Sequence, residues 1–208
     1  MKQLWTEDHF SGFEGKYYNY PAFYEPYLSI PKPYQKPYPP MLLPVDSQES
    51  FVPMGTLGYK IAIGAGSSTH NLRGTTVQLE NVKSYRKAWK DAGHEGEPAT
   101  VVRIPTLLAD TKEEAERLSD ELMVLARRYF NGRIGIGSTD AGSASPDTTA
   151  EVNLFGTAED VVEKIEVLRE QYDTDEIMFE ANWTSSVPRD VVTNTIRILS
   201  DKVIPKFK

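Results

Sequence analysis

Two serines three positions apart, Ser47 and Ser50, are the residues whose type and spacing most clearly suggest chemistry. They follow an apolar run of strand length, MLLPV (41–45), and they open SQESFVPMGTLG (47–58), which has the pattern of a short helix. A helix that begins where a strand ends presents free backbone N–H groups and a partial positive charge, and two hydroxyls add further donors. This corner could bind a phosphate group. The spacing is also typical of serines that only cap the helix, and taken alone it favours the cap.

A second polar segment, GAGSSTHNLRG (64–74), follows a predicted strand. Its glycines suggest a nucleotide cradle, but it lacks both the order G-x-G-x-x-G and the lysine-serine pair of a P-loop, which disfavours that interpretation. His70 and Arg73 could meet a ligand there, although we favour a solvated loop. Trp183, just after the last predicted strand, could line a pocket or close the core, and the sequence favours neither.

Composition excludes several classes of function. Cysteine is absent, which removes disulfides, thiolate metal sites and cysteine nucleophiles. The three histidines, His9, His70 and His94, are scattered and lack a spaced carboxylate partner, so we expect no metal site. The net charge is −7 without a basic block, which disfavours binding to nucleic acid or to an anionic membrane.

The sequence contains no recognisable signal that would target the protein away from the cytoplasm. No apolar run approaches the roughly 18–20 residues of a membrane span, and the first residues lack the apolar core of a signal peptide. We therefore expect a cytoplasmic protein, and its 208 residues suit one domain or slightly more.

Strand and helix patterns alternate along the chain. We expect strands at 41–45, 59–64, 100–109 and 176–181, and helices at 47–58, 76–92, from 111 to about 129, at 157–172 and at 188–203. Four strands joined by helical crossovers indicate a parallel sheet and make half of an eight-stranded (β/α)8 barrel.

Several residues set the details of these elements. Thr111 with Glu114, and Thr157 with Asp160, predict capping boxes at two helix starts. Pro105 weakens the strand prediction at 100–109 unless the strand bends or bulges there. We also expect Pro205 to end the last helix, and residues 131–150, rich in Gly, Ser, Thr and Asp, to form a mobile loop.

Apolar residues at helical spacing predict the buried face of each long helix. Helix by helix, these are Val82, Tyr85, Trp89 and Ala92; Ala115, Leu118, Leu122, Leu125 and Tyr129; Val161, Ile165, Leu168 and Tyr172; and Val192, Ile196, Leu199 and Val203.

Seven segments, spread over nearly the whole chain, match one family in the family's order. They are LWTEDHFSGFEGKYY (4–18), PKPYQKPYPP (31–40), DSQESF (46–51), YRKAWKDAGH (85–94), LLADTKEEAERL (107–118), FGTAEDVVEKI (155–165) and VVTNTIRILSDKVIPKFK (191–208). By these segments the chain resembles the bacterial-luciferase-like flavin-dependent monooxygenases, whose fold is a (β/α)8 TIM barrel. The resemblance is to the C-terminal half of the family, so it implies a partial barrel: strands five to eight with their helices. The family's first four βα units match nothing here.

The resemblance implies two regions and a cofactor. Residues 1–40 would form an extended arm rich in tyrosine and proline, and residues 41–208 would form the C-terminal half of the barrel. A polyproline ligand for another protein's domain is the less favoured interpretation of the arm. In the family, the corner after the fifth barrel strand holds the phosphate of FMN or of a related deazaflavin.

That corner corresponds to Asp46, Ser47, Gln48 and Ser50, which the resemblance implies as cofactor contacts. The serines would act through their hydroxyls, and the other two residues through their backbone. Glu49 would turn away, because two anions repel. No catalytic residue is carried over, since nothing in this sequence matches the family's N-terminal active-site residues.

Two functions follow from the resemblance. The first is a flavin-dependent oxidoreductase or monooxygenase that oxidises a small organic substrate with reduced flavin and O2. The second is a non-catalytic remnant, or one subunit of a split enzyme, that acts by association. Its exposed strand edges would favour a homo-oligomer or a complementing N-terminal chain.

Overall fold

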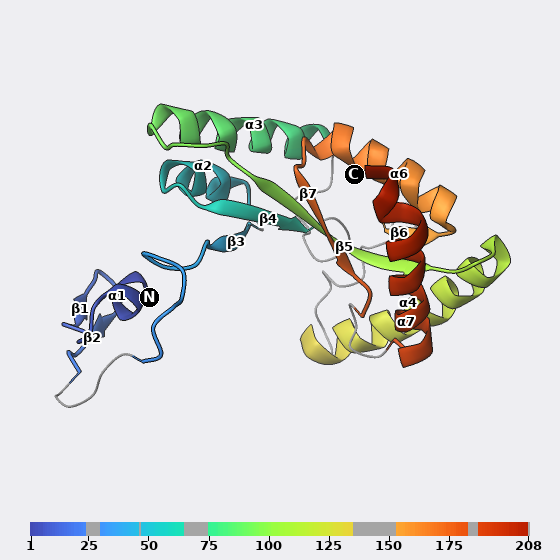
Figure 1. Cartoon of the computed structure of the whole chain (residues 1–208), viewed down its shortest axis with the longest axis horizontal. Coiled ribbons are helices and arrows are strands. Elements are labelled where there is room, and N and C mark those ends of the chain that lie inside the picture. The colour runs from blue at the N-terminus through green and yellow to red at the C-terminus, as the bar shows by residue number, and fades with distance from the viewer. Residues whose placement is uncertain (24–29, 46, 65–74, 135–152, 183–186, 208) are drawn as a thin grey trace. The chain divides into compact units, whose positions relative to one another are not determined.

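Five parallel strands run through the larger of two compact units, residues Leu42–Lys208 (Figure 1). The computed structural model describes residues 1–23, 30–45, 47–64, 75–134, 153–182 and 187–207. The strands are β3 (Leu42–Val45), β4 (Lys60–Gly64), β5 (Thr100–Leu108), β6 (Leu154–Gly156) and β7 (Glu176–Glu180). All four pairings among them are parallel, as the alternation of strand and helix patterns predicts.

The strand count corrects the sequence prediction, which missed β6. Three residues are too few to show the alternation by which a strand is recognised. The long strand β5 pairs with two strands in succession. It pairs with β7 over Val101–Pro105 and with β6 over Thr106–Leu108. The change falls at Pro105, which has no N–H to donate to a ladder. The predicted irregularity at this proline is therefore a change of partner within a continuous strand.

Within the described residues, five helices connect or follow these strands. They are α2 (Gln48–Thr56), α3 (Thr75–Asp91), α4 (Lys112–Ile134), α6 (Ala158–Tyr172) and α7 (Arg189–Ile198). Helix α4 is longer than predicted and takes in residues 131–134 of the predicted loop, whereas residues 135–150 lie outside the described residues. Pro205 does not end the last helical segment, because a π-helical turn (Leu199–Val203) and a 3-10 turn (Ile204–Phe207) follow α7. No helix in the described parts of the chain is long and apolar enough to cross a membrane.

The helices bury one face of the sheet. Phe51 of α2 and Tyr85 of α3 pack with Ile61 and Ile63 of β4, and all four side chains are fully buried. The buried face of α6 packs on Val102 and Ile104 of β5, as Figure 1 shows for the orange helix along the sheet. The predicted buried face of α6 is thereby confirmed, and so is that of α3 for Val82, Tyr85 and Trp89.

Two residues predicted to be buried lie in solvent. Ala92 is exposed just after α3 ends, and Ile196 of α7 is 55% exposed. Helix α7 instead turns Thr195 and Ile198 inward. The hydroxyl of Thr195 accepts a hydrogen bond from the backbone N–H of Leu108 at 3.2 Å, and this bond fixes the rotation of the helix against β5.

The two predicted capping boxes differ. At α6 the box is complete: Thr157 Oγ1 accepts from the N–H of Asp160, and Asp160 accepts from the N–H of Thr157 at 2.9 Å. At α4 the hydroxyl of Thr111 accepts from the N–H of Glu114 at 3.2 Å. The Glu114 carboxylate pairs with Arg117 instead, at 2.7 Å.

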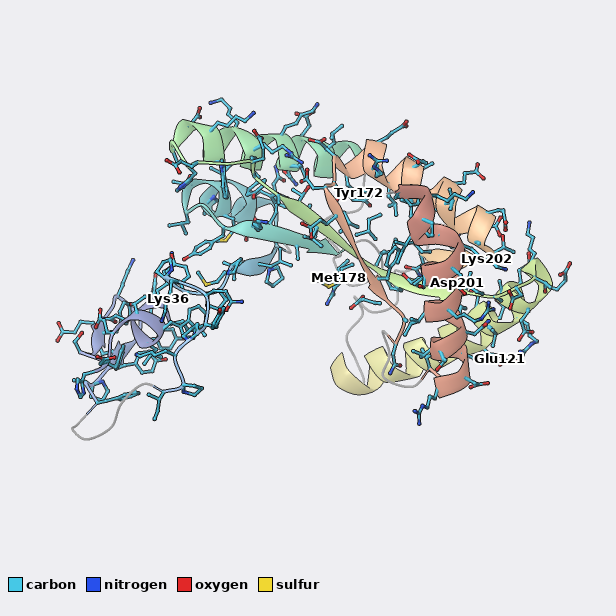
Figure 2. The ribbon with its side chains drawn as sticks, viewed as in Figure 1. Lys36, Glu121, Tyr172, Met178, Asp201 and Lys202 are labelled. Atoms are coloured by element: carbon cyan, nitrogen blue, oxygen red, sulfur yellow. The ribbon has the colours of Figure 1, made fainter. Side chains whose placement is uncertain are left out.

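Around Arg103 and Met178 the opposite face of the sheet is exposed within the described residues, whereas near the end of β5 Leu107 is buried against Leu122 of α4 and Val187. Side chains alternate along a strand, so neighbours of buried residues point away from the helices. Met178 of β7, between the partly buried Ile177 and Phe179, is 42% exposed and projects away from α7 (Figure 2). Arg103 of β5 lies between the buried Val102 and Ile104, and 48% of its side chain is exposed. We call this surface the open face.

The smaller unit, Met1–Met41, has little regular structure. It contains a one-turn helix, α1 (Lys2–Thr6), and an antiparallel hairpin of β1 (Phe13–Glu14) and β2 (Asn19–Tyr20). Aromatic rings hold it together, with Phe10 against Phe23 and Trp5 against Tyr38 at centroid distances of 5.2 and 6.2 Å. The beginning of the predicted arm thus holds short helix and hairpin elements.

Candidate functional site

The serine corner forms where β3 passes into α2. Val45, the last residue of β3, is buried, and Ser47 stands at the N-cap with an extended backbone. The hydroxyls of Ser47 and Ser50 lie 2.9 Å apart, and both residues are half-buried. The structure therefore brings the two predicted serines together at one point.

The Ser47 side chain makes no capping hydrogen bond, although the sequence pattern favours one. Its backbone carbonyl accepts from the N–H of Ser50 at 3.1 Å, while its hydroxyl faces the hydroxyl of Ser50. The N–H of Ser50 is thus used within the turn, while within the described residues those of Gln48 and Glu49 have no acceptor and could serve an outside one. This arrangement differs from a plain N-cap, in which the hydroxyl would be used up by the helix itself.

Tight packing fixes the direction of α2 behind the corner. Phe51 is fully buried in the cluster with Tyr85 and Trp89 of α3. Gly55 lies so close to α3 that a Cβ there would stand 2.4 Å from the backbone oxygen of Tyr85. The Tyr85 hydroxyl donates to the backbone oxygens of Tyr59 and Ala99, and its burial raises its pKa to about 12. The N-terminus of α2 is therefore held on a rigid support.

The remaining predicted contacts contribute less. Gln48 and Glu49 are exposed in the first turn of α2, and Asp46 lies outside the described residues. His70, Arg73 and Trp183 also lie outside them, so their predicted roles stay predictions.

The two described histidines have structural or solvent positions. His9 is exposed, and His94 Nε2 lies 2.8 Å from the backbone oxygen of Thr56, with its ring against Trp89. Across the described parts of the chain, no three His, Asp or Glu side chains gather in a way that could hold a metal ion.

A charged pair on the open face was missed by the sequence analysis. Arg103 Nε lies 3.5 Å from a carboxylate oxygen of Glu180, the last residue of β7. The available signal was the single arginine inside the apolar strand TVVRIPTLL, because a charge there must point away from the core.

Known proteins are similar to this chain in sequence family and in fold. The family model for luciferase-like monooxygenases matches residues 1–175. Among curated proteins, no sequence matches.

Solved structures share the fold over nearly the whole chain. The monooxygenase RslO1 from Streptomyces bottropensis is 17% identical, with a TM-score of 0.67 over 100% of this chain and 58% of its own. The oxygenating constituent of 3,6-diketocamphane monooxygenase from Pseudomonas putida, solved with FMN, is 22% identical, with a TM-score of 0.66 over 99% of this chain and 60% of its own. An F420-dependent secondary alcohol dehydrogenase, solved with an F420-acetone adduct, is 14% identical, with a TM-score of 0.58 over 93% and 58% of the two chains.

The chain thus spans about three fifths of the length of these structures, 58% to 60%. Together with the parallel sheet and its helical crossovers, the likeness confirms the fold that the sequence predicts, part of a (β/α)8 barrel.

Proposed function

This chain belongs to the luciferase-like monooxygenase family, and from that membership we propose that it is a flavin-dependent oxidoreductase acting on a small organic substrate. We propose further that it uses reduced flavin and O2, as a monooxygenase. The observation that carries the proposal is the pair of hydroxyls of Ser47 and Ser50 at the start of α2, whose oxygens lie 2.9 Å apart. The Ser47 hydroxyl makes no hydrogen bond that caps the helix. A cytoplasmic location stays a prediction from the sequence.

The serine corner fits the phosphate of a flavin cofactor. Phosphate oxygens accept hydrogen bonds, and the corner supplies two hydroxyls and the N–H groups of a first helical turn. The corner also lies at the carboxyl end of a parallel strand, where barrels of this type carry their sites. FMN is our first choice of cofactor, and a deazaflavin is the alternative, since one similar structure holds FMN and another holds an F420 adduct.

The cofactor, when bound, supplies the redox chemistry. The residues of this chain would bind and orient it. Ser47 and Ser50 would hold the phosphate, with the backbone of Gln48 and Asp46 completing the contact. Glu49 is exposed, which keeps its charge in solvent.

A titration with FMN followed by flavin fluorescence tests this proposal. We expect micromolar binding by the intact chain and a loss of about tenfold or more in a Ser47→Ala, Ser50→Ala double variant, because each lost donor to a charged acceptor weakens binding. Ser84→Ala is the matched control, since Ser84 lies on α3 and its hydroxyl donates to the backbone oxygen of Glu80. The same titration with F420 distinguishes the two cofactors. An intact chain that binds neither, or a double variant that binds as well as wild type, would contradict the proposal.

A second candidate function is association as a non-catalytic or split-enzyme subunit. The observation that favours it is the open face, which carries the exposed Met178 and Leu42. In addition, β3 and β7 each pair on one side only within the described residues. A homo-oligomer or a complementing N-terminal chain would cover these surfaces.

A further inference from the structure

Arg103 is held at the carboxyl end of the neighbouring strands. In the register, Val45 pairs with Ile63, and the next residue of β4, Gly64, pairs with Arg103. Arg103 therefore lies one level beyond the end of β3, which is the level at which the serine corner begins. Sites in parallel α/β proteins form at this end of the strands.

Among the described residues, no side chain of β4 stands between Arg103 and the end of β3 at this level of the sheet. Strand β4 alone separates β5 from β3, and its residue at this level is Gly64, which has no side chain. Two strand spacings amount to about 10 Å. This span is comparable to the reach from the phosphate of a flavin to its ring.

The guanidinium of Arg103 has donors to spare. Within the described residues its one ion pair is through Nε to Glu180, at 3.5 Å, and its two terminal nitrogens have no hydrogen-bond acceptor there. A guanidinium carries five N–H donors in a rigid plane, so four remain for a ligand. Glu180 therefore orients the guanidinium of Arg103 through Nε and leaves its terminal N–H donors available.

We propose that Arg103 binds the ring of the flavin or deazaflavin, on the side that carries its carbonyl oxygens, with Glu180 as its positioning residue. The inference rests on the proposed function of the serine corner, because that corner sets where the phosphate end lies. A cation beside the ring also favours the more negative, reduced form of the cofactor.

Parallel titrations with FMN and riboflavin test the assignment, since riboflavin has the same ring and no phosphate. We expect Arg103→Ala to weaken both ligands by a similar factor, roughly tenfold or more, as for the loss of a charge-assisted hydrogen bond. Arg103→Lys should retain part of the affinity. The Ser47→Ala, Ser50→Ala variant should weaken FMN and leave riboflavin unchanged.

Lys60→Ala is the matched control. Lys60 is exposed at the other end of β4, next to the buried Ile61. Its side chain therefore lies on the open face, and Lys60→Ala removes one positive charge from that face, as Arg103→Ala does. It should bind both flavins as wild type does. A second readout is the midpoint potential of bound FMN, which Arg103→Ala should lower and Lys60→Ala should not change. Circular dichroism and thermal unfolding verify that the variants are folded.

Three outcomes would overturn the inference. If Arg103→Ala binds both flavins normally while the serine variant loses FMN, Arg103 has no part in the site and the proposed function stands. If Arg103→Ala loses FMN but keeps riboflavin, the arginine contacts phosphate and the ring assignment is wrong. If the intact chain binds neither flavin, the proposed function falls, and this inference falls with it.

Discussion

At the scale of single residues, the carboxylate of Asp160 at the start of α6 accepts hydrogen bonds from the cap of its own helix. Asp160 accepts from both the N–H and the hydroxyl of Thr157, at 2.9 Å in each case. These hydrogen bonds, the backbone one first, lower the pKa of Asp160 below its usual value. A carboxyl group with a lowered pKa in the folded state stabilises the fold above its unfolded pKa, and that stability is lost as the pH falls through the folded pKa.

We therefore predict that Asp160→Asn lowers the free energy of unfolding by about 0.5–1 kcal/mol at pH 7. The difference from wild type should shrink as the pH falls below the unfolded pKa of about 3.9 and through the lower folded pKa. Chemical denaturation at a series of pH values measures it. Glu159→Gln, an exposed first-turn neighbour with the same charge, is the control and should cost less. A gap for Asp160→Asn that is as large at pH 2 as at pH 7 would show that the charge does not matter.

At the scale of elements, the rotation of α7 depends on one buried hydroxyl. Spacing along the sequence favours Ile196 on the packed face, yet Ile196 is 55% exposed and Thr195 is buried against β5. The Leu108 N–H lies at the end of a strand, and Thr195 provides its acceptor. A buried N–H without an acceptor is costly, so satisfying it outweighs burying one more aliphatic side chain.

Thr195→Val tests this account because it keeps the shape of the side chain and removes the acceptor. We expect a loss of about 1–3 kcal/mol in the free energy of unfolding, the usual cost of leaving a buried donor unsatisfied. Ile196→Ala, one residue away on the exposed face, should change it by no more than about 0.5 kcal/mol. If Ile196→Ala proves the more damaging of the two in denaturant titrations, the rotation of α7 described above is wrong.

At the scale of the whole molecule, the larger unit has an asymmetric sheet. Helices cover one face, while the other carries Met178, Leu42 and Arg103 in solvent within the described residues. Among the described residues, strands β3 and β7 each have a single neighbour. Unpaired strand edges and exposed apolar side chains promote association.

We predict that the purified chain associates with itself in a concentration-dependent manner, which sedimentation velocity measures. Met178→Lys should weaken that association, because a charge would have to be buried in the contact. Ile196→Lys, also an exposed aliphatic residue but on the helical side, should leave it unchanged. A folded chain that sediments as a monomer at every concentration would contradict the prediction.

The sequence by itself determined the order of the helices and of four of the five sheet strands, the buried stripes of α3 and α6, the complete cap at Thr157 and the pairing of Ser47 with Ser50 at a helix start. These features are local: they depend on residues a few positions apart, whose periodicity and chemistry are visible along the chain. Only the tertiary structure decided the rest. It revealed strand β6, the change of partner at Pro105, the burial of Thr195 in place of Ile196, and Arg103 two strands from the serine corner. Each of these depends on which distant segments pair and in what register, and spacing along a single segment carries no record of that.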